Sequence, residues 1–242
     1  MDALSLTGAA MLNDVERMRV ISNNLANLTT VGFKRELSVS RPFADLVTGM
    51  ADSAGTVSRA SAPSVVSYTD QGSGVLKYTA GPLDIALEGS GLLVVDAPWG
   101  EGLTRQGSLR LDEQGRLVTQ SGHVVQGEGG EIRLSSPEPR IDAEGYVWDG
   151  DNKVARLRIV EVTDARTLER LGSGMFAATE STEYVEPVST RVRQGYVEAA
   201  NVTSMNEMVH MIETMRHFES SQRLLRGYDD MMDRAINLLG EL

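Results

Sequence analysis

The sequence predicts an α+β protein in which long N- and C-terminal helices are paired as a coiled-coil-like domain, with a central antiparallel all-β domain between them. The first observation behind this prediction is a seven-residue spacing of apolar residues at both ends of the chain. The second is a middle region in which short apolar runs alternate with Gly, Asp and Asn. Helical and extended segments differ in these periods, so the two patterns predict two kinds of secondary structure.

The N-terminal segment, residues 1–32, is expected to form a helix from about residue 3 to residue 28. Its apolar stripe consists of Leu4, Met11, Met18 and Leu25. The helix is followed by three β-branched residues and a glycine that favour its end, Thr29, Thr30, Val31 and Gly32. Burying a Met or Leu side chain contributes roughly 1.5–3 kcal/mol, so the stripe is expected to find an apolar partner.

The middle of the chain is divided by its turn residues. Residues 33–80 are interrupted by Gly and Pro and are expected to be an extended linker, with its clearest strand at residues 64–69. Residues 81–185 are expected to form the β domain, and residues 186–203 a return linker. Strands of the β domain are expected at residues 83–87, 92–95, 108–111, 117–119, 132–134, 154–162 and 175–178.

The C-terminal segment, residues 204–242, is expected to be one helix of about 36 residues. Ser204 and Glu207 form a capping-box pattern at its start, and Gly240 marks its end. Its apolar stripe consists of Met211, Phe218, Leu225, Met232 and Leu239. The simplest partner for each terminal helix is the other one.

Composition excludes several classes of function. The formal net charge is −11, which argues against binding to nucleic acid or to an anionic membrane surface. There is no cysteine, so disulfides and thiolate metal sites cannot contribute. We expect no cleavable secretory signal, because the first residues lack a basic region and an apolar run, and no membrane insertion, because no run of about 18 apolar residues occurs.

Candidates for catalysis or metal binding fail on inspection. Ser90, between two glycines, is followed by an expected strand, which provides no helix N-terminus for a phosphate. The Asp149-Gly150-Asp151 sequence lacks the sixth-position glycine and the final glutamate of a calcium loop. His210 and His217 lie about 10 Å apart along a helix, too far for one metal ion. We therefore expect no catalytic residue, cofactor or metal, although the many carboxylates leave a cell-wall glycosidase open.

Several motifs in this chain resemble those of one protein family. Residues 22–35 (SNNLANLTTVGFKR) closely resemble the stretch that ends the first helix in bacterial flagellar rod and hook proteins. Residues 82–91, 104–109 and 115–119 are similar to the central β segments of this family, and residues 194–202 (QGYVEAANV) to its lead into the last helix. Residues 216–219, 229–230 and 234–239 of the last helix look most like the proximal rod protein.

The resemblance implies a non-enzymatic structural subunit of the flagellar basal body, exported through the flagellum's own type III apparatus and assembled in the periplasm into a hollow axial rod. Its partners would be neighbouring rod subunits, other axial basal-body proteins and the export apparatus. Two alternatives stay open: a distal rod subunit, and a secreted cell-wall hydrolase or adhesin acting through the β domain. The expected assembly interface comprises Leu4, Met11, Met18, Asn23, Asn24, Leu25, Asn27, Leu28, Met211, Phe218, Leu225, Met232 and Leu239.

Overall fold

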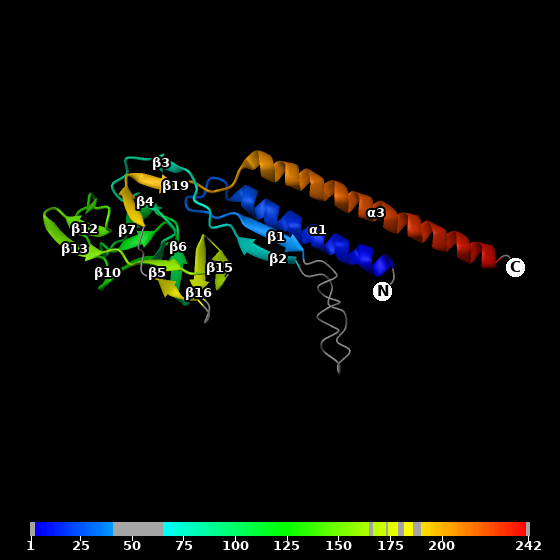
Figure 1. Ribbon diagram of the computed structural model, residues 1–242, viewed down its shortest axis with the longest axis horizontal. Helices are drawn as coiled ribbons and strands as arrows, with labels where there is room; N and C mark the ends of the chain where they lie inside the picture. The colour runs from blue at the N-terminus through cyan, green and yellow to red at the C-terminus, as the bar shows by residue number, and fades with distance from the viewer. Residues whose placement is uncertain are drawn as a thin grey trace, which may run out of the picture. The chain divides into compact units, whose positions relative to one another are not determined.

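The computed structural model describes residues 3–40, 65–164, 167–172, 174–178, 182–185 and 190–240. The chain divides into two compact units, each described by itself. The helical unit contains Met1–Ala26, Glu36–Tyr68 and Thr203–Leu242, and the β unit contains Asn27–Arg35 and Thr69–Val202. Helices at the two ends of the chain and antiparallel strands between them confirm the α+β prediction (Figure 1).

The first helix, α1, spans Ala3–Ala26 and ends two residues before the expected position. A turn follows at once, because the Thr30 amide donates to the Asn27 carbonyl at 3.0 Å and the Thr30 hydroxyl donates to the Asn27 side chain at 3.2 Å. Gly32 then takes a positive φ of 68°. These local bonds, which apolar spacing does not reveal, end the helix early.

The last helix, α3, spans Ser204–Gly240, as its capping residues predicted. Its 37 residues correspond to a length of about 55 Å. Among the described residues, no helix is both long enough and apolar enough to pass through a membrane.

Within the helical unit, α1 and α3 run side by side in opposite directions (Figure 1). The Asn24 side chain on α1 donates to Glu207 Oε2 on α3 at 3.2 Å, and Asp14 Oδ2 lies 2.6 Å from His217 Nδ1. Strand β1, Glu36–Ser40, pairs with β2, Val65–Thr69, and β1 also joins α1. The side chain of Asn24 makes that connection. Its Nδ2 donates to the Glu36 carbonyl and its Oδ1 accepts from the Glu36 backbone amide, both at 2.8 Å.

The β unit is built around one large antiparallel sheet with the strand order β15-β16-β6-β5-β9-β8-β7. Strands β10, β14 and β17 belong to the same sheet but lie outside this order: β10 pairs with β9, and β14 pairs with both β5 and β17. The strands of the sheet are β5 Leu92–Ala97, β6 Gly100–Thr104, β7 Leu109–Leu111, β8 Leu117–Thr119, β9 Val124–Gly127, β10 Gly130–Glu131, β14 Ile159–Val162, β15 Leu168–Gly172, β16 Met175–Ala178 and β17 Tyr184–Val185.

Three smaller pairings complete the β unit. One joins β11, β12 and β13 in that order, a second joins β18 to β4, and a third joins β19 to β3. Their strands are β3 Leu76–Tyr78, β4 Ile85–Glu88, β11 Arg140–Ile141, β12 Tyr146–Asp149, β13 Asn152–Arg156, β18 Arg191–Gln194 and β19 Tyr196–Glu198. The pairings of β18 and β19 return the end of the β unit to its first strands, because Gln194 pairs with Ile85 and Glu198 with Leu76.

Apolar side chains from both the large sheet and the smaller pairings form the main core of the β unit. Burying this surface is the main driving force for folding the unit. The buried members of the core are Ile85, Leu87, Leu93, Val95, Leu109, Leu117, Val125, Ile132, Leu134, Ile141, Val147, Leu157, Met175 and Val192.

Two strand predictions are corrected by the structure. Ile132 and Leu134 are buried, but residues 132–134 form one isolated bridge, Arg116 with the exposed Arg133, rather than a strand. Residues 154–162 are not one strand, because β13 ends at Arg156 and β14 begins at Ile159. In residues 132–134, the Ile132 carbonyl accepts from the Leu117 amide and the Leu134 amide donates to the Gly115 carbonyl. These backbone groups are therefore satisfied by bonds to the turn before β8 and to its first residue, without a continuous strand ladder.

Candidate functional site: a buried charge cluster at the crossing segments

The chain passes between the two units after Ala26, Arg35, Tyr68 and Val202. The parts of the β unit next to these crossings are residues 27–35, 69–74 and 198–202. They converge on a set of polar residues that we call the crossing cluster: Lys34, Arg105, Glu198 and Asn201.

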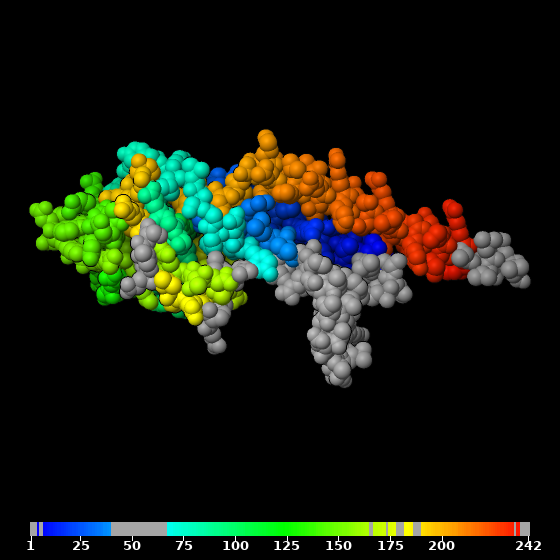
Figure 2. Space-filling model, viewed as in Figure 1, coloured from blue at the N-terminus to red at the C-terminus, as the bar shows by residue number. Residues whose placement is uncertain are grey.

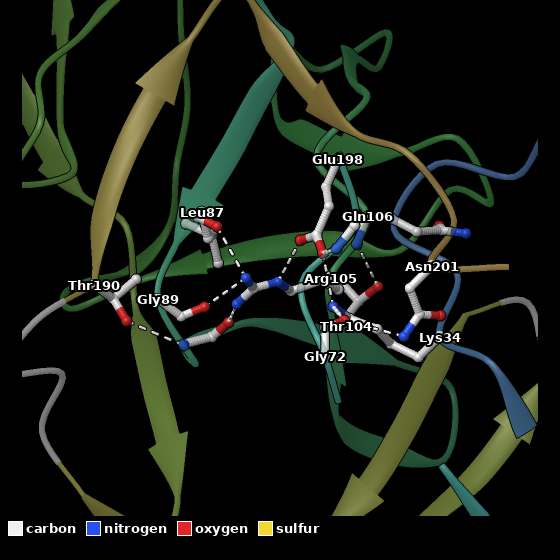
Figure 3. Close-up of polar contacts among 12 residues, drawn as sticks. Lys34, Gly72, Leu87, Gly89, Thr104, Arg105, Gln106, Thr190, Glu198 and Asn201 are labelled. Carbon is white, nitrogen blue, oxygen red and sulfur yellow. Dashed lines mark hydrogen bonds and ion pairs between the residues drawn. The ribbon is translucent and has the colours of Figure 1, made fainter. Parts of the chain in front are cut away.

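Glu198, on β19, is the centre of the crossing cluster (Figure 3). Its Oε1 accepts from Lys34 Nζ and from the Gly74 amide, both at 2.7 Å, and its Oε2 accepts from Arg105 Nε at 2.6 Å. Glu198 and Lys34 are each 1% exposed and Arg105 is 4% exposed. A carboxylate removed from water in this way requires close cationic partners, and both of its oxygens have them.

Arg105 follows β6, and its guanidinium donates hydrogen bonds to three backbone carbonyls of one neighbouring segment (Figure 3). Its guanidinium donates to the carbonyl of Leu87 at 2.9 Å, to that of Gly89 at 2.5 Å and also to that of Gly91. The Gly89-Ser90-Gly91 turn therefore presents carbonyl oxygens to a buried cation. This arrangement is the reverse of a phosphate-binding loop, which presents amide N–H groups.

Asn201 connects the crossing segments to one another. Its Oδ1 accepts from the Arg35 amide at 2.6 Å, and its Nδ2 donates to the carbonyls of Asp70 at 2.9 Å and Gly72 at 3.0 Å. Lys34 Nζ also donates to the Gly72 carbonyl at 2.9 Å. The crossing cluster therefore fixes the three segments in one arrangement within the β unit.

Opposing influences act on the ionisation of the cluster. Burial is the largest single influence on Glu198, and alone it would raise the pKa of this carboxyl group. The attraction to Arg105, the hydrogen bond and attraction to Lys34, and the hydrogen bond from the Gly74 amide together outweigh burial. The pKa of Glu198 therefore lies below its ordinary value. Burial lowers the pKa of the Lys34 ammonium, and the hydrogen bond to Glu198 opposes this shift. A Glu198 held ionised with both oxygens occupied is suited to fixing structure and not to donating a proton in catalysis.

The lowered pKa of Glu198 predicts a loss of stability in acid. Because the folded state binds this proton more weakly than the unfolded state, the stability from Glu198 is present above its ordinary pKa of 4.5 and is lost as the pH falls through the lower folded value. We expect the difference in unfolding free energy between the wild type and Glu198→Gln to shrink between about pH 5 and pH 2. Urea unfolding of both proteins across this range measures it, and a constant difference would contradict the ion-pair account.

Gly32 lies against the same cluster, and its replacement is expected to be costly. Its amide donates to the Glu198 carbonyl at 2.7 Å, its φ is +68°, and a Cβ here would lie 2.4 Å from the Arg105 carbonyl oxygen. Gly32→Ala should lower the free energy of unfolding by about 3 kcal/mol, through backbone strain and overpacking. Gly129→Ala is the matched control, because a Cβ at Gly129 meets no atom within 4 Å. Equal melting temperatures for the two variants would refute this expectation.

The predicted interface residues on the N-terminal side occupy varied environments. Leu4 and Asn23 are exposed, Met11, Met18 and Leu25 are half-buried, and Asn24 is buried. Asn27 and Leu28, both half-buried, belong to the β unit. Among the side chains of α1 that the structure describes, the most buried lie beside the predicted stripe, at Asp14, Val20, Ile21 and Asn24.

On α3, the predicted stripe alternates with buried polar residues. Met211, Phe218 and Leu225 are half-buried, and Met232 is exposed. Glu207, Thr214 and Ser221, also seven residues apart, are more deeply buried. The side chain of Leu239 lies outside the described part of the structure.

The residues considered for catalysis or metal binding have structural contacts. Asp149 and Asn152 form the end of the β12–β13 hairpin, and Asp149 Oδ2 accepts from the Ser135 amide at 2.9 Å. His210 Nδ1 lies 3.5 Å from Glu213 Oε2, whereas His217 contacts Asp14 on α1. In the described ranges of the chain, no group of three His, Asp or Glu residues is placed to hold a metal ion.

Sequence reasoning did not single out Lys34, Arg105, Glu198 or Asn201. Charged residues are usually solvated, so their types gave no sign of burial. One signal was present, because each of the four stands within a stretch that resembles the flagellar rod and hook proteins: residues 22–35, 104–109 and 194–202.

Comparison with known proteins agrees with this resemblance. Family models match residues 6–34 (flagella basal body rod protein), residues 86–151 (flagellar hook protein FlgE/F/G D1 domain) and residues 193–238 (flagellar basal body rod FlgEFG protein, C-terminal). The chain is 34% identical to the flagellar basal-body rod protein FlgF of Salmonella typhimurium over 93% of both chains. It is 30% identical to FlgF of Mesorhizobium japonicum over 99% of this chain and 98% of that protein.

A rod protein with a different name, FlgG, is also similar over nearly the whole chain. The flagellar basal-body rod protein FlgG of Caulobacter vibrioides is 29% identical over 98% of this chain and 99% of its own. The three family models match consecutive parts of the chain that include most of both terminal helices, many of the central strands and all four residues of the crossing cluster. The chain therefore belongs to the flagellar basal-body rod protein family, and it is a structural subunit of the flagellar rod.

Proposed function

We propose that this subunit occupies the proximal part of the rod and assembles with neighbouring rod subunits through its terminal helices, packed in a coiled-coil-like manner. The proximal position is supported by the resemblance of residues 216–219, 229–230 and 234–239 to the last helix of the proximal rod protein. A distal position along the same axis is the alternative. The expected interface residues on α1 and α3 are part of this proposal.

One observation carries the assembly role: α3 has a second apolar face that is turned to solvent. Met205, Met208, Ile212 and Met215 follow one another at helical spacing, and each is 49% to 72% exposed. Figure 2 shows side chains projecting from α3, in orange, on the side turned away from α1, in blue. An exposed apolar stripe of this kind is typical of an interaction surface.

The C-terminal half of α3 adds to this surface. Leu224, Met231 and Ile236 are 62% to 66% exposed. Since α3 has 37 residues and α1 has 24, α3 has a length for which α1 provides no partner. Helices of neighbouring subunits would cover both regions and remove their apolar surface from water.

The proposed subunit is not an enzyme, is exported through the flagellar type III apparatus and acts in the periplasm, with other axial proteins as partners. The most buried carboxylate of the β unit, Glu198, supports a structural role, since its cationic partners hold it ionised. In the parts of the β unit that the structure describes, no observation favours the hydrolase or adhesin alternative.

The proposal is tested by locating the protein. Basal bodies purified from the host should contain this chain, and an epitope tag placed in the β unit should be found by immunogold electron microscopy at the membrane-proximal end of the rod. A label at the opposite end of the rod would favour the distal alternative. Absence of the chain from basal bodies, together with release of soluble fragments from peptidoglycan by the purified protein, would favour the hydrolase.

A further inference from the structure

The apolar residues of the two terminal helices do not by themselves define how the helices align. Leu4, Met11, Met18 and Leu25 repeat every seven residues, as do Met211, Phe218, Leu225 and Met232. A helix pair held by these residues alone would pack similarly after one helix slides by seven residues. The excess length of α3 gives α1 room to slide toward the C-terminus.

Two polar contacts break this repetition. Asp14 and Asn24 on α1 are 2% and 1% exposed, and Glu207 on α3 is 1% exposed. Asp14 contacts His217 at 2.6 Å and Asn24 contacts Glu207 at 3.2 Å. The step of ten residues from Asp14 to Asn24 equals the step back from His217 to Glu207, so both contacts specify the same antiparallel alignment.

We propose that the contacts Asp14 to His217 and Asn24 to Glu207 select one register of the α1–α3 pair from alternatives spaced by seven residues. This role belongs to the helix pair of a single chain and does not depend on assembly into a rod. It requires that a slide of the helices separates both polar pairs at once.

The consequences of a slide toward the C-terminus follow from the spacing. Asp14 would lie opposite Leu224 in place of His217, and Asn24 opposite Thr214 in place of Glu207. Leu224 has no donor for the Asp14 carboxylate, so the buried Asp14 would lose the contact that His217 makes, and this is costly. Thr214 is a weaker substitute for Glu207, because a neutral hydroxyl, whose proton is donated to the His210 carbonyl at 2.8 Å, would accept from Asn24 in place of a carboxylate. The polar contacts thus penalise a register that the apolar residues tolerate.

Cysteine cross-linking of the purified full-length chain tests the proposal, because the native sequence has no cysteine. Ala10 and Ser221 stand two heptads from Asn24 and Glu207, so Ala10→Cys with Ser221→Cys reports the observed register. Ala10→Cys with Tyr228→Cys reports the register displaced by seven residues. Both pairs are introduced into the wild type and into an Asp14→Leu/His217→Leu/Glu207→Leu variant, in which Asn24 is kept because it also bonds Glu36.

In the wild type, a disulfide is expected between positions 10 and 221. In the leucine variant, the fraction cross-linked between positions 10 and 228 should rise at least about tenfold. Cross-linking of the leucine variant through positions 10 and 221 alone would show that the covalent connections fix the register, and would overturn the proposal. Equal cross-linking of both pairs in the wild type would overturn it too.

A reciprocal exchange, Asp14→His with His217→Asp, guards against a general loss of folding. It keeps one Asp and one His in contact but exchanges the helices that carry them, so the cross-link between positions 10 and 221 should be retained. If the exchange slides as the leucine variant does, the contact itself does not select the register. Circular dichroism at 222 nm checks that the helices of every variant are formed.

Discussion

Replacing Glu198 by glutamine is expected to lower the free energy of unfolding of the β unit by about 3–5 kcal/mol. The substitution keeps the shape of the side chain and removes the charge that Lys34 and Arg105 share. Both cations would remain buried, and a buried cation without its counter-ion is strongly destabilising. Urea unfolding followed by tryptophan fluorescence measures the change, because Trp99 and Trp148 both lie in the β unit.

A matched control separates burial from charge. Glu128→Gln removes a carboxylate that pairs with Arg156 at 2.8 Å on the surface, where the effect should be within about 1 kcal/mol. Adding Lys34→Met to Glu198→Gln should restore part of the stability, since it removes one of the two unpaired cations. If Glu198→Gln is no more destabilising than Glu128→Gln, the crossing cluster does not hold the β unit together.

Phe218→Asp is expected to abolish swimming while the β unit stays folded. Phe218 is half-buried on α3, one helical turn from both buried Thr214 and buried Ser221. A carboxylate there would lose its hydration and would stand beside His217, whose partner Asp14 is itself an acid. The helix pair should lose about 3 kcal/mol or more. We expect Leu25→Asp on α1 to have the same result.

Ser220→Asp is the control for this substitution. It places the same charge two residues along α3 at a position that is exposed in the single chain, so it should leave the α1–α3 pair and the helix content unchanged. Soft-agar motility measures function, and the tryptophan fluorescence of the purified variants measures the β unit. Normal motility of the Phe218→Asp and Leu25→Asp strains would contradict the assembly role of the terminal helices.

The helices could be predicted from the sequence because their determinants are local. Ser204 and Glu207 specified the start of α3 and Gly240 its end. In the structure, the Glu207 amide donates to the Thr203 carbonyl at 3.1 Å, and the Glu207 side chain accepts a hydrogen bond from Asn24 on the other helix. The apolar spacing marks residues that are half-buried in the structure, among them Met18 and Phe218. It could not show that the most buried positions include Asp14, Asn24 and Glu207, because burial of a polar residue depends on a distant partner.

Strand prediction succeeded where apolar residues were continuous. The bounds of β8 and β16 match the expected residues 117–119 and 175–178. Strand β6, Gly100–Thr104, went unrecognised because two glycines weaken its propensity for extended structure, although it pairs along the length of β5. Its position is decided by pairing with a neighbour and not by its own residues.

The crossing cluster illustrates the limit of sequence reasoning most clearly. Glu198 is separated from Arg105 by 93 residues and from Lys34 by 164. No spacing rule connects side chains so far apart, and their charges suggest solvent exposure. Only the fold brings them together, and resemblance to a family identified the stretches in which they stand but not their contacts.

Electron microscopy of basal bodies from a strain lacking the gene for this chain tests the central claim most directly. If the chain is a subunit of the rod, these basal bodies should keep their membrane-embedded base, lack a complete rod, and regain it when the wild-type gene is restored. Complete rods and normal motility in the deletion strain would contradict the claim.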